Sequence, residues 1–214
     1  MRYTCKGNWV LDPFAGSGTT LIECRRCGRN AVGVELVPRV ATWANQLIKA
    51  QENNQVFAEV ITGDSTSPST KRSVQAILAA HNVNQVQLII LHPPYHNIIR
   101  FSDDPRDLSN APSIRVFLKK LKTVVRSFAD LLEEGRYMIL VMGDLYSKGE
   151  YIPLAFKSMD AILTTGLFKL KAEIIKNING NRGKIGQESL WQYRALKGGF
   201  FIFKHEHIYV FQKV

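Results

Sequence analysis

Hydrophobic and polar positions follow two different patterns along the chain. Short apolar runs bounded by turn residues predict strands at residues 8–12, 31–36, 58–64, 85–91 and 136–144. Apolar residues at helical spacing predict helices over about 19–27, 39–51, 74–81, 113–134 and 152–165. Strands that alternate with helices indicate βαβ units, and therefore an α/β fold with a mostly parallel sheet.

The carboxyl-terminal part departs from this alternation. Residues 167–178 and 207–213 both have strand patterns, and we expect them to form an antiparallel pair at one edge of the sheet. The stretch of about 179–199 between them is glycine-rich and basic, which is typical of a long insertion. The pattern thus predicts a single domain over residues 1–214, with this insertion loop as a candidate recognition element.

Composition and charge narrow the classes of protein. A hydrophobic content of 45% over 214 residues suits one domain with a sizeable core, and no apolar run is long enough to span a membrane. Three cysteines without a framework spacing favour reduced thiols and a cytoplasmic setting. The net charge of +10 favours a polyanionic partner, with nucleic acid as the first choice and a merely basic surface as the alternative.

A glycine-rich turn follows the first predicted strand, in "VLDPFAGSGTT" at residues 10–20. Ligands of doubly wound sheets bind at the carboxyl ends of strands, and glycines allow the backbone to approach them closely. The turn has no lysine before Ser/Thr, as a phosphate-binding P-loop requires, and it lacks the third glycine of the dinucleotide fingerprint. Asp12 would also repel a phosphate, so the turn favours a ligand with a cationic or hydroxyl-rich end.

Two further carboxylates lie where later strands end. Glu35 closes the second strand and can accept both hydroxyls of a ribose, while Asp64 closes the third and can accept from an adenine amino group. Together with the turn, they predict a pocket for S-adenosylmethionine. The alternative is that Gly16 and Gly18 only shape a tight turn and that Glu35 is solvated.

The fourth predicted strand ends abruptly in "LIILHPPYH" at residues 88–96. Consecutive prolines fit neither a helix nor a central strand, so this segment forms a stiff turn that carries an aromatic ring.

Four segments give the chain a family resemblance: "DPFAGSGTT", "GRNAVGVEL", "HPPY" and "HEHIYVFQK". They resemble the DNA amino-methyltransferases, which methylate N6 of adenine or N4 of cytosine, and the resemblance extends over nearly the whole chain. It implies a Rossmann-like S-adenosylmethionine-dependent methyltransferase fold of seven strands, the last antiparallel. It also implies a prokaryotic-type enzyme of the cytoplasm, as in restriction–modification systems. The implied cofactor contacts are Asp12, Phe14, Gly16, Gly18, Thr19, Glu35 and Asp64.

The resemblance also assigns roles in the proline turn. His92 and the carbonyl of Pro93 would accept hydrogen bonds from the target amine, Pro94 would stiffen the turn, and Tyr95 would stack on a base flipped out of DNA. The family has Asp, Asn or Ser where this chain has His92. A neutral imidazole has one acceptor nitrogen and an imidazolium has none, so we expect activity to fall as pH drops through the pKa of His92. The alternative is that His92 marks a weak or inactive enzyme.

Nucleic acid would meet the loop after Tyr95 and the basic insertion, where basic residues are interleaved with aromatic ones. The candidate contacts are His96, Asn97, Arg100, Arg106, Arg182, Lys184, Trp191 and Arg194.

Other activities and sites remain as alternatives. An RNA guanine-N2 methyltransferase uses the same motif order, and a catalytically silent binder of nucleic acid is the alternative from another class. We expect no metal site, because the Cys24/Cys27 pair has no second pair and His205 and His207 share only a strand face. The first strand begins close to Met1, so the chain is expected to be a fragment that lacks an upstream segment or to have an open pocket. The sequence leaves the oligomeric state open.

Overall fold

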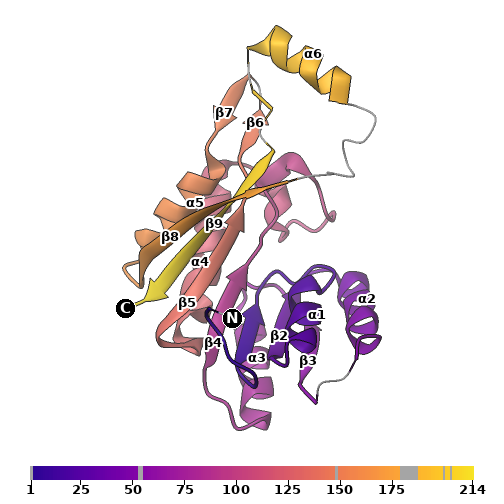
Figure 1. Ribbon diagram of the computed structural model, residues 1–214, viewed down its shortest axis with the longest axis vertical. Coiled ribbons are helices and arrows are strands. Elements are labelled where there is room, and N and C mark those ends of the chain that lie inside the picture. The colour runs from indigo at the N-terminus through magenta and orange to yellow at the C-terminus, as the bar shows by residue number, and fades with distance from the viewer. Residues whose placement is uncertain (1, 53–54, 148, 179–187, 200, 203) are drawn as a thin grey trace.

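The computed structural model describes residues 2–52, 55–147, 149–178, 188–199, 201–202 and 204–214. Their main feature is a seven-stranded sheet with the order β3-β2-β1-β4-β5-β9-β8 (Figure 1). Neighbours from β3 to β5 pair in parallel, whereas β9 is antiparallel to both β5 and β8. The mostly parallel sheet and the antiparallel edge pair are therefore confirmed. The strands are β1 (Trp9–Asp12), β2 (Asn30–Glu35), β3 (Ala58–Thr62), β4 (Val86–Leu91), β5 (Leu132–Met142), β8 (Phe168–Asn177) and β9 (His205–Lys213).

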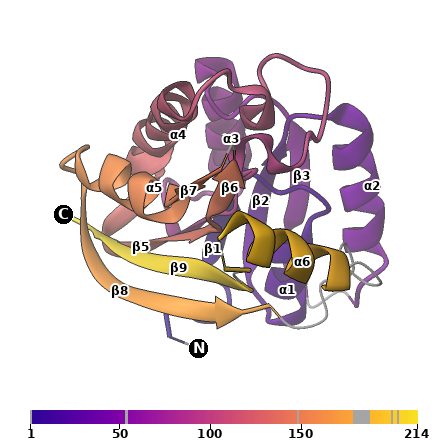
Figure 2. The same cartoon turned by 90° about the horizontal axis from the view of Figure 1, so that it is seen from above.

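Helices cover both faces of this sheet (Figure 2). On one face, α3, α4 and α5 pack against alternate strand residues such as Leu11 and Ile89. On the other, α1 and α2 pack against the intervening residues, including Val10 and Leu88. The helices are α1 (Thr19–Arg26), α2 (Pro38–Lys49), α3 (Pro68–Ala80), α4 (Ile114–Phe128), α5 (Leu154–Leu163) and α6 (Glu188–Gly198).

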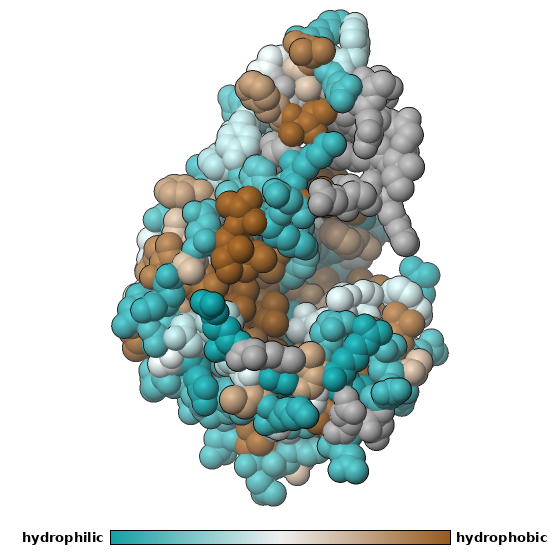
Figure 3. Space-filling view, viewed as in Figure 1, coloured by the Kyte–Doolittle hydropathy of each residue, from teal (hydrophilic) through white to brown (hydrophobic). Residues whose placement is uncertain are grey.

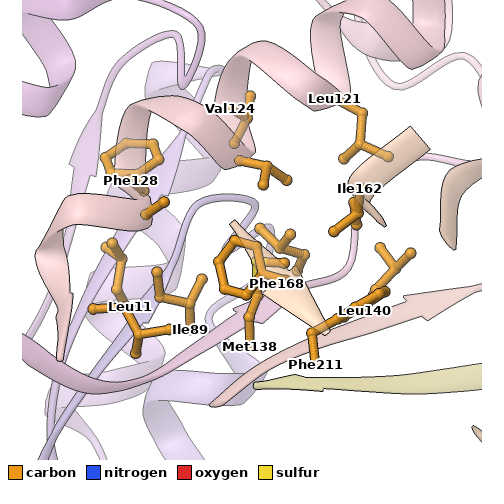
Figure 4. Close-up of a cluster of buried hydrophobic side chains, with 14 of the residues drawn as sticks. Leu11, Ile89, Leu121, Val124, Phe128, Met138, Leu140, Ile162, Phe168 and Phe211 are labelled. Atoms are coloured by element: carbon orange, nitrogen blue, oxygen red, sulfur yellow. The ribbon is translucent and has the colours of Figure 1, made fainter. Parts of the chain in front are cut away.

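The larger core lies between the sheet and the helices α4 and α5 (Figure 4). Phe128 of α4 and Phe211 of β9 are almost fully buried in it, as are Leu121, Met138 and Leu140. Burial of one such side chain contributes about 1.5–3 kcal/mol, so this cluster fixes β4, β5 and β9 relative to one another. The residues of β8 that follow Phe168, by contrast, are almost all exposed at the edge of the sheet.

Several boundaries differ from the sequence prediction. Helix α3 begins at Pro68, because the Ser67 hydroxyl caps it by accepting from the Ser69 N–H and proline suits the first helical position. Helix α4 ends at Phe128 rather than near 134, because Leu132 already pairs with Val86 in the sheet. A hairpin of β6 (Leu145–Ser147) and β7 (Glu150–Ile152) precedes α5, in a stretch for which the sequence predicted no strand.

The predicted insertion loop is partly helical. Residues 188–198 form α6, which Figure 1 shows at the far end of the molecule from α3. Residues 179–187 lie outside the described part of the chain. Among the described residues, none of the helices combines the length and apolar character needed to cross a membrane.

Candidate functional site

A cavity of about 550 Å³ opens at the carboxyl ends of β1, β2, β3 and β4. Its place between β1 and β4 is the point where the strand order reverses, which is where doubly wound sheets bind ligands. Figure 3 shows the molecule hollowed beside the part that carries α2. The walls combine backbone from the glycine-rich turn, two carboxylates, the proline turn and an apolar side that includes Val37, Val40 and Trp43.

The glycine-rich turn reaches the cavity through Phe14 and Gly16. Gly16 has a positive φ of 51°, and a side chain there would project into open space rather than into protein. Gly18 is different: a Cβ at this position would stand 3.1 Å from Ile48 Cδ1, so this glycine lets the turn pack against α2. Gly16 thus keeps the backbone open to a ligand, whereas Gly18 serves packing.

Asp12 lies beneath the turn and not on the cavity wall. Its Oδ1 accepts from the Phe14 N–H at 2.9 Å, and its side chain is only 2% exposed. Burial raises the pKa of Asp12 to about 6, against opposing hydrogen bonds from Thr20 and Phe14. Phe14 and Gly16 line the cavity, whereas Asp12, Gly18 and Thr19 are not among its lining residues, and their predicted cofactor contacts stay predictions.

Glu35 joins the ends of β1 and β2 within the cavity. Its Oε2 accepts from the Gly16 N–H at 3.1 Å and its Oε1 from the Val37 N–H at 2.8 Å. Burial nonetheless raises the pKa of Glu35 above its ordinary value. A carboxylate has about four lone-pair sites, so it retains acceptor capacity for a ligand hydroxyl.

Asp64 lines the same cavity one strand further along. Its Oδ1 accepts from both the N–H and the hydroxyl of Thr66, at 2.8 and 2.7 Å. These bonds leave Oδ2 for a ligand donor. The structure therefore brings Phe14, Gly16, Glu35 and Asp64 together as the sequence predicted.

The proline turn faces these carboxylates across the cavity, with His92, Pro93, Pro94 and Tyr95 all on its wall. His92 Nε2 lies 2.8 Å from the Tyr95 hydroxyl, which donates to Glu206 Oε1 at 2.6 Å. Lys176 holds the other oxygen of Glu206 at 2.8 Å. The histidine and tyrosine of the turn are thus connected to an ion pair on β8 and β9.

This chain of contacts fixes the proton on His92. The hydrogen bonds from Lys176 and Tyr95 outweigh burial and lower the pKa of Glu206, so it is a carboxylate that only accepts. The Tyr95 hydrogen is committed to it, so the Tyr95 oxygen accepts from His92 Nε2–H. Burial lowers the pKa of His92 below its ordinary value, so the ring is neutral at pH 7 and its Nδ1 carries the free lone pair.

Gly143, directly after β5, supports the tyrosine. A Cβ at this position would stand 2.7 Å from Tyr95 Cε2, closer than any real contact. The ring therefore rests on bare backbone. Burial also raises the pKa of Tyr95 well above its usual range, which keeps the hydroxyl protonated as the donor to Glu206.

The sequence prediction missed Gly143, Glu206 and Lys176. Glu206 carried a usable signal, since it alternates with two histidines on the last strand and so points to the opposite face. No local pattern marks Lys176, whose role depends on the pairing of β8 with β9.

The predicted nucleic-acid contacts separate into three groups. His96 is buried with its ring edge-on to Phe117, so the prediction that it is available to a phosphate is contradicted. Its positive φ of 50° turns the side chain inward at the start of a short 3₁₀ turn, His96–Ile98. Asn97 and Arg100 are exposed, and Arg106 lines the cavity while its guanidinium binds Asp104 at 2.6 Å.

The third group lies in the basic insertion. Arg182 and Lys184 lie outside the described residues. Trp191 and Arg194 belong to helix α6, and the structure describes only their backbone.

Comparison with known proteins agrees with this site in two ways. Residues 1–46 match the model of a DNA methylase family, the N6/N4 methyltransferases. The Type II methyltransferase M.MthZI of Methanothermobacter thermautotrophicus is 56% identical over 34 residues, which are 16% of this chain and 10% of that protein. The chain thus resembles DNA amino-methyltransferases over short segments that contain the glycine-rich turn, a smaller extent than the motifs alone suggested.

The fold matches over the whole chain. A solved S-adenosylmethionine-dependent methyltransferase from Methanosarcina mazei has a TM-score of 0.61 at 12% identity, covering 99% of this chain and 95% of that one. TrmN from Thermus thermophilus has a TM-score of 0.60 at 14% identity, covering 99% of this chain and 45% of that one. The fold is that of S-adenosylmethionine-dependent methyltransferases, as predicted.

Proposed function

We propose that the chain transfers a methyl group from S-adenosylmethionine to the exocyclic amino group of a DNA base, N6 of adenine or N4 of cytosine. One observation carries the proposal: the glycine-rich turn, the carboxylates of Glu35 and Asp64, and the His92–Tyr95 turn all line one cavity. The family match over residues 1–46 covers the turn and Glu35, and together with the short matches to Type II methyltransferases it favours DNA over other acceptors.

The cavity has the size and the hydrogen-bond acceptors that suit such a cofactor. A volume of about 550 Å³ lies in the usual range for small-molecule sites. In our proposal Glu35 accepts from the ribose hydroxyls, Asp64 accepts from the adenine amino group, and the open side of Gly16 admits the amino-acid end. Bound there, the cofactor supplies an electrophilic methyl group.

The residues of the proline turn prepare the acceptor nitrogen. The lone pair of an exocyclic amine is delocalised into the base, so the nitrogen is a poor nucleophile until its N–H bonds are held by acceptors. His92 Nδ1 and the Pro93 carbonyl are the acceptors in this proposal, and Nδ1 takes the proton that the amine loses. Tyr95 stacks on the flipped base, and Gly143 and Glu206 fix its position before the substrate arrives.

The basic charge supports a nucleic-acid partner. Arg106 lines the cavity, and the exposed Asn97 and Arg100 are adjacent in the chain to residues that line it; in this proposal all three contact the DNA backbone. The predicted contacts of the insertion, Arg182, Lys184, Trp191 and Arg194, remain part of the proposal, as does a cytoplasmic setting.

The test is methyl transfer from tritiated cofactor to duplex DNA and to tRNA, followed by mass spectrometry of the nucleosides. We expect N6-methyladenine or N4-methylcytosine from DNA, and none with the Tyr95→Ala variant. Label found only in tRNA guanine would overturn the DNA assignment in favour of the RNA alternative. Tight cofactor binding without transfer to either nucleic acid would identify a silent binder, with His92 as the cause.

A further inference from the structure

Two histidines and an aspartate lie close together on the side of β9 that faces away from the proline turn. His205 and His207 lie at the start of β9, and Asp144 follows β5. Each offers one ligand atom, and the three atoms lie within 4.8 Å of one another. None of these residues lines the cavity described above, whereas Glu206 between them does.

The hydrogen bonds of His207 leave an unfavourable contact. Its Nδ1 lies 2.8 Å from Glu173 Oε1, and because a carboxylate only accepts, this nitrogen donates. The opposite nitrogen, Nε2, is buried without a hydrogen-bond partner and lies 3.4 Å from Asp144 Oδ2. In a neutral ring, two lone-pair-bearing atoms therefore face each other, and a cation between them would remove this repulsion.

Asp144 is held in place for such a cation. Its Oδ1 accepts from the Ala155 N–H at 2.8 Å, and its Oδ2 accepts from the Tyr151 hydroxyl. The residue is only 5% exposed, so it cannot turn toward water without breaking these bonds.

We propose that Asp144, His205 and His207 bind a divalent transition-metal ion, with zinc as the first choice. Two imidazoles and one carboxylate form a typical zinc ligand set, and Glu173 supplies the carboxylate–histidine contact that orients a ligating ring. Zinc–ligand bonds of about 2.0–2.1 Å place tetrahedral ligand atoms roughly 3.3–3.4 Å apart. The pair formed by His207 and Asp144 already has this separation, and the ligand atom of His205 lies within 4.8 Å of both.

A proton on His207 is the competing cation. It would satisfy His207 and Asp144, but it would not use the ligand atom that His205 offers beside them. The metal accounts for all three residues and joins the start of β9 to the junction between β5 and β6. From the sequence we expected no metal, because His205 and His207 share only a strand face; Asp144 lies far from them in the chain, and the β5–β9 pairing brings it near.

Isothermal titration of the chelator-stripped full chain with zinc chloride tests the site. We expect one zinc per chain at micromolar affinity or tighter, with at least a tenfold loss in Asp144→Asn and in His205→Gln. Asp144→Asn is a sound probe because an amide oxygen still accepts from the Ala155 N–H. A Cys5→Ser/Cys27→Ser variant is the control for thiol binding, and it should keep both stoichiometry and affinity.

Thermal melting supplies the second measurement. Zinc should raise the melting temperature of the parent chain and leave that of Asp144→Asn unchanged, each compared with the same protein free of metal. The proposal is overturned if the folded parent chain binds no zinc, if Asp144→Asn and His205→Gln bind it as well as the parent, or if the cysteine variant alone loses binding. These outcomes do not depend on methyl transfer.

Discussion

Gly143→Ala tests the most constrained contact of the proline turn. A methyl group at this position would stand 2.7 and 2.9 Å from two ring carbons of Tyr95. Ordinary carbon–carbon contacts need about 3.5–4.0 Å, so the ring must move by roughly 1 Å. The backbone itself tolerates alanine, since Gly143 is not among the residues with positive φ.

The expected magnitudes follow from this displacement. Overpacking of this kind costs about 1–3 kcal/mol, and each kcal/mol lowers the melting temperature of a chain of this size by about 2–4 °C. A catalytic group displaced by 1 Å can cost on the order of 10²-fold in rate. Gly143→Ala should therefore lower both stability and methyl transfer, although residue 143 carries no reactive group.

A double-mutant cycle with Tyr95→Ala isolates the cause. Without the ring there is nothing for the new methyl group to meet, so Gly143→Ala should cost less than about 0.5 kcal/mol in that background. Denaturant unfolding of the four proteins measures both values. Equal costs in the two backgrounds would refute the contact between Gly143 and Tyr95 as the source of the strain.

Three further predictions concern charge. Because burial lowers the pKa of His92 and the neutral ring is the acceptor, methyl transfer should be constant above pH 6.5 and fall as the pH drops below it; a rate profile that stays flat into acid contradicts this role. The folded-state pKa of Asp12 is raised from 3.8 to about 6, so folding favours the protonated carboxyl. Its contribution to the free energy of unfolding is therefore lost as the pH rises from 3.8 through about 6. Over this pH range the free energy of unfolding of the parent chain should fall by about 3 kcal/mol more than that of Asp12→Asn. The same pH dependence in both proteins would count against a raised pKa for Asp12. In Glu35→Gln the single amide oxygen can accept from only one of the two N–H groups that bind the carboxylate. Calorimetry should therefore show S-adenosylmethionine binding weakened about 10–100-fold. Unchanged affinity would exclude Glu35 from the site.

Much of the fold was predictable because the signals are local. Alternation of strand and helix patterns gave the parallel sheet, and the carboxyl ends of its strands gave the positions of Gly16, Glu35 and Asp64. The misjudged boundaries depend on neighbours. Leu132 suits a helix by sequence, and only its partner Val86 places it in a strand.

The site was less predictable where partners come from distant strands. The sequence presented His92 as an isolated anomaly, whereas the structure connects it through Tyr95 to Glu206 and Lys176. His96 shows the opposite error: a polar residue in a polar loop was expected to face solvent, but its backbone turns the ring inward. Asp12 likewise belongs to the motif that lines the cavity and yet lies below its surface.

The edge strand β8 has a consequence for assembly. Within the described chain it pairs only with β9, so its other side offers unpaired backbone groups to a strand of another molecule. Exposed apolar residues such as Ile174 and Ile175 would favour such pairing. Lysines at positions 169, 171 and 176 oppose it, because stacking two such edges would bring like charges together. Part of the chain's positive charge therefore protects against aggregation, and only the remainder is available to attract a polyanion.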